Sequence, residues 1–272
     1  MIAVVVCAGC AASRTAMWVA AADPPPADVS GVIALGERAF EEREDSARLD
    51  EALRQWRTAL RETPGDAALL VKLSRAARLR AHDVRGRAGD ALADEAVGFA
   101  ERALALREPL RKRARELRPA TAVFEAAERD DEPALIAYAE ALFDWSERRG
   151  LATLMAQQDW IRAAAHRAVV LDRAAGHGAP DRVLAMLEAT LPLDSGALLL
   201  DSLERFEASV ASAPRYLPTR LEYAQRYAVR VRDGRLYRRL LEEVVAADAD
   251  ALADARPENR AAQRAARRLL AD

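Results

Sequence analysis

Cysteine and histidine are the side chains best suited to metal binding or nucleophilic chemistry, and this sequence holds two cysteines and three histidines. Cys7 and Cys10 have the C-x-x-C spacing of redox and zinc sites. A redox pair of this kind lies beside a βαβ pattern, and a zinc site needs further ligands close by. Neither feature follows in the sequence, so redox or metal binding is the less favoured interpretation of this pair.

The same cysteines end a short apolar run. Residues 1–13 read MIAVVVCAGCAAS, which is too short to cross a bilayer, because a spanning helix needs about 20 apolar residues. The four residues from Cys7 to Cys10 resemble a bacterial lipobox, in which small residues precede a cysteine that becomes lipidated. Cys7 stands where leucine is usual, and no Lys or Arg precedes the run, which is compatible with a start upstream of Met1. We expect Cys10 to be the lipid attachment site, with a plain signal peptide or frayed terminus as the alternative.

A proline-rich stretch follows the apolar run. Pro24, Pro25 and Pro26 favour an extended polyproline conformation, which suits a tether between an anchor and a folded body. A disordered terminus would have the same composition. We interpret residues 1–27 as a lipoprotein signal peptide plus tether, and residues 28–272 as a single all-α domain.

The remaining sequence offers no recognisable catalytic set. His82, His166 and His177 are far apart, and no H-E-x-x-H or comparable metal spacing occurs. G-x-S-x-G, P-loop and G-x-G-x-x-G motifs are also missing from the sequence. Adjacent carboxylates are expected on solvated helix faces in a chain with 43 acidic residues. The sequence therefore predicts a protein that is not an enzyme, with no metal and no cofactor.

Aromatic and charged residues on two consecutive predicted helices form a candidate ligand cleft. They are Trp145, Asp159, Trp160 and Arg162. The alternative is that the tryptophans belong to the core and that Asp159 bonds locally. An α-helical hydrolase with its site in this region is a third possibility, disfavoured because no nucleophile or metal set accompanies it.

The amino-acid composition limits the classes of protein to which this chain can belong. The 272 residues are 51% hydrophobic and 31% charged, with a net charge of −2, which is typical of a globular domain and argues against a nucleic-acid partner. No segment of the body alternates apolar and polar residues over the length of a strand. Helical periodicity and breaks instead predict about eleven or twelve helices joined by short connections.

Two stretches share one spacing of small, aromatic, small and proline residues. They are Ala52, Trp56, Ala59, Pro64 and Ser202, Phe206, Ser209, Pro214, with a weaker copy at Ala96, Ala100 and Ala103. This spacing resembles the second helix of a tetratricopeptide (TPR) repeat. The small residues let two helices approach, the aromatic ring fills the gap, and the proline turns the chain. We therefore predict degenerate TPR-like hairpins stacked into a bundle or short superhelix.

Four stretches, taken in order, carry a resemblance to a known family. They are residues 131–150, residues 176–196, the hairpin over 194–228, and the final helices LYRRLLEEVV and PENRAAQRAARRLL. Together with the lipobox they resemble the TRAP-transporter T-component (TatT) family of periplasmic helical lipoproteins. The chain departs from the family pattern in having alanines for aromatic residues within 131–150.

The resemblance implies a homotrimer of TPR-like bundles in the periplasm, held by a lipid anchor alone, with the outer membrane favoured. Such a trimer docks the periplasmic solute-binding subunit of a tripartite ATP-independent (TRAP) transporter. A pore and hydrophobic cleft for small apolar or organic-acid ligands are implied as well. The family supplies no catalytic residue, and Cys10 is the one position carried over. A generic TPR-like adaptor that binds a peptide in its concave groove is the alternative.

Overall fold

The computed structural model describes residues 28–192 and 199–271 and contains thirteen α-helices and no strand within those ranges, so the predicted all-α fold is confirmed. The helices are α1 (Ser30–Glu41), α2 (Ser46–Glu62), α3 (Ala67–Asp83), α4 (Gly86–Ala105), α5 (Glu108–Arg115), α6 (Ala120–Phe124), α7 (Glu132–Arg148), α8 (Leu151–Asp172), α9 (Ala175–Thr190), α10 (Leu199–Ser212), α11 (Leu217–Glu222), α12 (Gly234–Ala246) and α13 (Arg256–Ala271). The predicted lipidation site at Cys10 and the proline tether lie outside the described residues.

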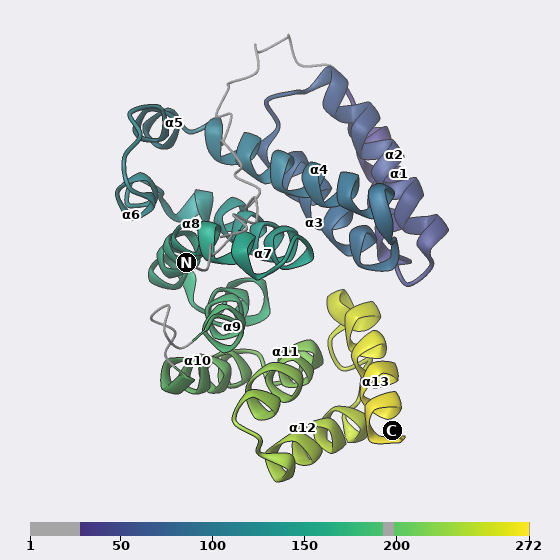
Figure 1. Cartoon of the computed structure of the whole chain (residues 1–272). Helices are drawn as coiled ribbons and strands as arrows, with labels where there is room; N and C mark the ends of the chain where they lie inside the picture. Colours follow the sequence, from purple (N-terminus) through teal and green to yellow (C-terminus); the bar gives the residue numbers. More distant parts are fainter. Residues whose placement is uncertain (1–27, 193–198, 272) are drawn as a thin grey trace, which may run out of the picture.

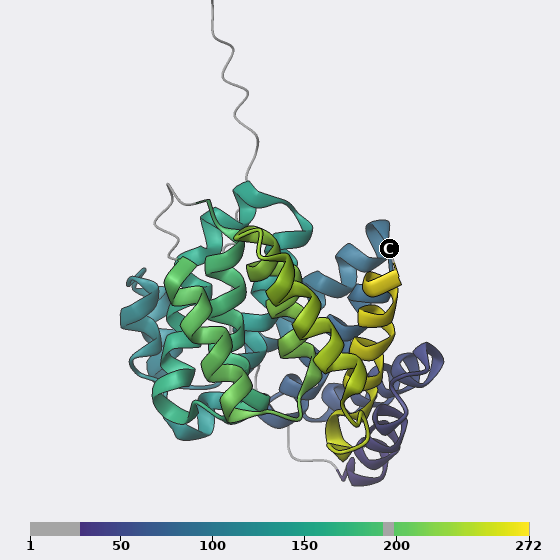
Figure 2. The same ribbon diagram turned by 90° about the horizontal axis from the view of Figure 1, so that it is seen from below.

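Consecutive helices pair into hairpins. Helix α1 packs on α2, α3 on α4, α7 on α8, and α9 on α10. Figure 1 shows the helices following one another around a curved array, with α13 at one end returning toward the side on which α1 to α4 lie. Seen from below, the green helices of residues 175–230 lie side by side as successive members of the stack (Figure 2).

The two TPR-like stretches end in the same turn. After α2, the Thr63 amide bonds the Ala59 carbonyl and the Asp66 amide bonds the Thr63 carbonyl. After α10, residues 213 and 216 repeat both bonds at equivalent positions. Pro64 and Pro214 occupy the same place in the two turns. Because proline cannot continue a helix, each hairpin reverses at this point.

The aromatic residue of each stretch is buried between helices. Trp56 lies against Gly36 of α1, where a side-chain Cβ would fall 2.3 Å from the indole Nε1, so only glycine permits this approach. The indole N–H donates to the Ile33 carbonyl at 3.2 Å. Phe206 stacks on Tyr223, with the ring centroids 5.0 Å apart. The ring at this position therefore fixes the distance between neighbouring helices.

Small residues beside the ring allow close packing. Ala52 and Ala59 are fully buried in the first stretch, as are Ser202 and Ser209 in the second. The serine hydroxyls donate to carbonyls of α9, Ser202 to Ala185 and Ser209 to Gly178, each at 2.9 Å. These bonds satisfy polar groups that would otherwise be buried without partners.

Two segments differ from the sequence-based expectation. The stretch RAHDVRGRAG over residues 80–89 predicts a loop, but α3 continues to Asp83 and α4 begins at Gly86. The extension is held from outside, because Arg148 of α7 donates to the Ala81 and Val84 carbonyls. Helix α6 was not expected at all, since five residues are too few to show a helical period. It brings the helix count above the predicted eleven or twelve.

Candidate functional site

A cavity of about 530 Å³ lies at the centre of the array. Helices α3, α7 and α9 provide most of its wall, and Tyr216, Asp254 and Glu258 approach it from the C-terminal third of the chain. Its volume lies within the range of about 300–1,000 Å³ that is common for ligand sites. Residues far apart in sequence therefore enclose a space that a small molecule could occupy.

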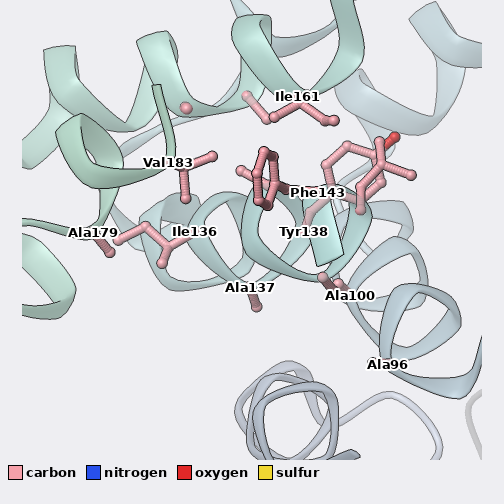
Figure 3. Close-up of a cluster of buried hydrophobic side chains, with 14 of the residues drawn as sticks. Ala96, Ala100, Ile136, Ala137, Tyr138, Phe143, Ile161, Ala179 and Val183 are labelled. Atoms are coloured by element: carbon pink, nitrogen blue, oxygen red, sulfur yellow. The ribbon is translucent and has the colours of Figure 1, made fainter. Parts of the chain in front are cut away.

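Helix α7 is the element that positions this cavity. Glu132 and Pro133 occupy its first turn, where an acidic side chain and a proline are favoured. One face of α7 packs on α8, and Figure 3 shows Tyr138 and Phe143 among the side chains beside Ile161. Toward α9, Ile136 lies near Ala179 and Val183 in the same view. The helix is buried on most sides, so its lining residues are held in place.

Alternating charges line one end of the cavity and continue past it. Arg182 of α9 donates to Glu140 at 2.8 Å, and the second oxygen of Glu140 lies 2.9 Å from Arg78 of α3. Arg78 also reaches Asp144 at 3.1 Å, and the His82 ring nitrogen lies 2.9 Å from the same carboxylate. These five side chains form one network that ties α3, α7 and α9 together.

The network keeps its carboxyl groups ionised. Burial disfavours the charge of Glu140, but Arg78 and Arg182 outweigh burial and hold the pKa of Glu140 below its ordinary value. Burial likewise opposes the charge of Asp144, while His82 and Arg78 hold its pKa well below the usual range. In return, the negative charge of Asp144 raises the pKa of His82. Each buried carboxylate is therefore compensated by cations in direct contact.

A second cavity of about 210 Å³ lies on the other side of Arg78. It shares Arg78 with the larger cavity and is also lined by His82 and Asp144. Arg78 and its ion-pair partners therefore lie between the two cavities.

A left-handed turn lines the larger cavity at the start of α9. Gly176, His177 and Gly178 all have positive φ, with His177 at 60°, which is uncommon for a residue that is not glycine. The Gly-His-Gly motif at residues 176–178 predicts a break between helices, and the structure has this break as a reversal of backbone handedness. A Cβ on Gly178 would lie 2.8 Å from the Ser209 hydroxyl, so α10 packs against this turn without room for a side chain.

Three contacts hold His177 in that conformation. Its ring stacks on Tyr216 at 5.0 Å, and its Nε2 lies 3.2 Å from Asp254. Its carbonyl accepts a hydrogen bond from Arg182 at 3.2 Å, and the Arg182 guanidinium also lies 4.8 Å from the Tyr216 ring centroid. Strained residues held by their surroundings concentrate at functional sites, which marks this wall of the cavity.

The residues predicted to line a cleft are only partly brought together. Asp159, Trp160 and Arg162 line a groove of about 620 Å³ between α8 and α6, separate from the central cavity. Trp160 packs edge-on against Phe124, and Arg162 pairs with Glu188 at 2.8 Å. Ligand binding in this groove stays a prediction.

Trp145 lies apart from that groove. Its indole N–H donates to Asp94 of α4 at 2.7 Å, and Arg149 covers its ring at 4.2 Å. The side chain is buried between α7 and α4. Trp145 therefore lies in the hydrophobic core, which was the alternative interpretation of this residue from the sequence.

The residues that line the central cavity were largely missed from the sequence. Arg78, Glu140 and Arg182 look there like ordinary charges on helix faces. The single usable signal was the Gly-His-Gly break, which marked an interruption of the helix but not its role as a cavity wall. Within residues 28–192 and 199–271, no group of His, Cys, Asp and Glu side chains is placed to hold a metal ion.

The fold defines a helical-repeat protein whose stacked helices surround a half-open cavity. A family model described as TRAP transporter T-component matches residues 65–272. The chain belongs to this family, as its sequence resemblance predicted, and the match begins directly after the first TPR-like hairpin. No curated protein matches the chain.

Family membership gives the chain a role in TRAP transport as an accessory component associated with the bacterial cell envelope. The family is not a known class of enzymes. Among the described helices, none combines the length and apolarity that a membrane crossing requires.

Proposed function

We propose that the chain is a non-catalytic accessory lipoprotein of a TRAP transporter and that it binds the periplasmic solute-binding subunit. The family match over residues 65–272 is the observation that carries this proposal. The stacked hairpins support it, because helical-repeat arrays present extended surfaces suited to protein partners. Copurification tests it: the full-length tagged chain should bring down the solute-binding subunit of its own transporter. Recovery of unrelated proteins without that subunit would favour a generic adaptor.

The proposal places residues 1–27 as a signal peptide and tether, with the lipid on Cys10. The folded body, residues 28–272, would then stand in the periplasm at a membrane surface, with the outer membrane favoured. Labelling of cells with a clickable fatty acid tests the anchor. A Cys10→Ala variant should lose the label, whereas the matched Cys7→Ala variant should keep it. Label retained on the Cys10→Ala chain contradicts lipidation at Cys10.

We propose further that the working form is a homotrimer. Native mass spectrometry of the full chain released from membranes should show three copies of a chain whose peptide mass is 29.7 kDa before processing. A single copy at all concentrations contradicts this part of the proposal. The experiment is independent of the copurification, so the two parts can fail separately.

The central cavity is the proposed ligand site of this subunit. It lies between packed helices and is open to solvent on one side, has a volume suited to a small molecule, and combines apolar side chains with charged residues. This combination of shape, apolar area and a few polar groups is typical of small-molecule sites. A small apolar or amphipathic ligand fits these features.

A further inference from the structure

The two ends of the central cavity differ in charge balance. Glu140, at one end, is matched by Arg78 and Arg182. Glu132 lines the cavity at the other end, in the first turn of α7. Glu132 and Glu140 are separated by about 12 Å along the axis of that helix, given a rise of about 1.5 Å per residue. A ligand that spans this distance would meet a neutralised cluster at one end and Glu132 at the other.

Glu132 stands apart from the cations of this network. Within residues 28–192 and 199–271, no Lys, Arg or His side chain forms an ion pair with its carboxylate. Arg129, the guanidinium whose charge acts on Glu132, forms an ion pair with Asp172 at 3.2 Å. Burial raises the pKa of Glu132, the charge of Asp172 raises it further, and Arg129 opposes both effects. The N-terminus of α7 favours the charge of this partly buried carboxylate, but no cationic side chain among the described residues pairs with it.

The cationic residues of the cavity wall, in contrast, are all committed. Arg182 and Arg78 share Glu140, and Arg78 also contacts Asp144. Arg75 pairs with Glu258 at 3.1 Å. An organic acid would have to compete with these carboxylates for a guanidinium, while a cation meets at Glu132 a carboxylate that has no ion-pair partner in the described part of the chain. The charge pattern thus favours a positive ligand group over a negative one.

Apolar side chains form much of the remaining wall, beside the polar groups of His177, Tyr216, Asp254 and Glu258. Its lining side chains come from α3, α7 and α9 and include Val71, Leu79, Pro133, Ile136, Ala137 and Ala179. Figure 3 shows Ile136 and Ala179 close together at this wall, with Ala137 on another side of α7. An apolar body gains free energy by leaving water for such a surface. The distance between Glu132 and Glu140, the apolar lining side chains and the Glu132 carboxylate together therefore favour an amphipathic ligand.

We propose that the central cavity binds a small molecule with an apolar body and one ammonium-type cationic end, and that Glu132 is the counter-ion of that end. The inference rests on the proposed role of the cavity as a ligand site and adds the chemical class of the ligand. In this proposal, the Glu132 carboxylate contacts the cationic end of the ligand directly and makes the cavity specific for cationic ligands.

Calorimetric titration of the full-length chain in detergent tests this assignment with three probes that share a six-carbon body. The probes are hexylamine, 1-hexanol and hexanoate, and titration into detergent alone corrects for partition into micelles. Hexylamine should bind at least about tenfold more tightly than hexanoate, which corresponds to about 1.4 kcal/mol or more. Hexanol should fall between them, since it fills the cavity without pairing with Glu132.

Variants locate the binding and assign the charge effect. Glu132→Gln should weaken hexylamine binding about tenfold or more and leave hexanol unchanged. The matched variant Glu62→Gln removes the same charge at an exposed position at the end of α2, away from the cavity, and should bind as the wild type does. Ala137→Phe fills the cavity and should weaken all three probes, with circular dichroism melting used to verify that this variant folds.

The outcomes separate the inference from the function on which it rests. Binding of hexanoate as tight as that of hexylamine, or hexylamine binding that survives Glu132→Gln, overturns the cationic specificity while the cavity remains a ligand site. Failure of all three probes to bind overturns both the specificity and the ligand role of the cavity. Neither result depends on docking of the solute-binding subunit.

Discussion

Arg43 and Glu258 form a bidentate ion pair although 215 positions separate them in the sequence, with Nε and Nη2 at 2.9 and 2.6 Å from the carboxylate oxygens. Their side chains are only 6% and 11% exposed. Arg75 contacts the same carboxylate, and the Phe40 ring lies 4.6 Å from the Arg43 guanidinium. The pair joins the end of α1 to the start of α13, and Glu258 also lines the central cavity. The first and last parts of the array are therefore held together beside the central cavity.

Removal of this carboxylate should be strongly destabilising. Glu258→Ala leaves the Arg43 guanidinium buried without its counter-charge, and breaking a buried pair in this way costs about 3–5 kcal/mol. The free energy of unfolding from urea denaturation measures the loss. If α1 and α13 separate before the rest unfolds, the transition should also broaden.

Glu44 provides the matched control for that variant. It also joins the first hairpin to α13, through Arg260 and Arg264, but these side chains are 34% to 49% exposed. Solvent screens such pairs, so Glu44→Ala should cost no more than about 1 kcal/mol. If the two variants lost equal free energy of unfolding, the Glu258 ion pair would stabilise the array no more than the exposed pairs of Glu44.

Phe206 tests the repeat packing. The ring is fully buried and stacked on Tyr223, so Phe206→Ala should lower the free energy of unfolding by about 3–5 kcal/mol. Leu200 on the same helix is 65% exposed, and Leu200→Ala should stay within about 0.5 kcal/mol of the wild type. A Phe206→Ala chain that melts like the wild type would mean that this ring does not set the spacing between the helices.

The ion network predicts a specific dependence of stability on pH. Asp144 raises the pKa of His82 in the folded state, so protonation of His82 favours folding. That stabilisation is complete below the ordinary pKa of about 6.5 and is lost as pH rises through the folded value. Because His82 is more than half exposed, the effect should remain below about 1 kcal/mol. Melting at several pH values should show that His82→Gln loses less stability than the wild type toward alkaline pH.

His166 supplies a control of opposite sign. Burial and the nearby Arg205 and Arg162 lower the pKa of His166 in the folded state, so its protonation disfavours folding. As the pH falls through about 6.5, the His166→Gln variant should therefore lose less free energy of unfolding than the wild type. If both His→Gln variants changed the pH dependence of stability in the same direction, the environments described for these two histidines would be contradicted.

Local patterns carried enough information to predict the helices and their main breaks. Trp56 and Phe206, each flanked by small residues and followed by proline, mark helices whose packing depends on neighbours in sequence. The Gly-His-Gly motif at residues 176–178 likewise indicates its own backbone reversal, because glycine tolerates positive φ. Predictions of this kind succeed where the cause lies within about one hairpin.

The cavity depends on contacts that no local pattern contains. Arg78, Glu140 and Arg182 come from three helices and meet only because those helices stack in one arrangement. The tryptophans illustrate the same limit. Trp145 and Trp160 lie on consecutive helices, yet Trp145 contacts α4 and Trp160 contacts α6. Sequence proximity suggested one cleft, whereas the packing of α7 and α8 directs the two rings to different neighbours.

We propose that this member of the TRAP transporter T-component family binds the solute-binding subunit of its transporter. Titration of the purified full-length chain with that purified subunit, followed by sedimentation velocity, tests this binding. We expect a saturable complex of defined stoichiometry that an unrelated periplasmic solute-binding protein does not form. Two independently sedimenting species at every concentration, or equal binding of the unrelated protein, would contradict the claim.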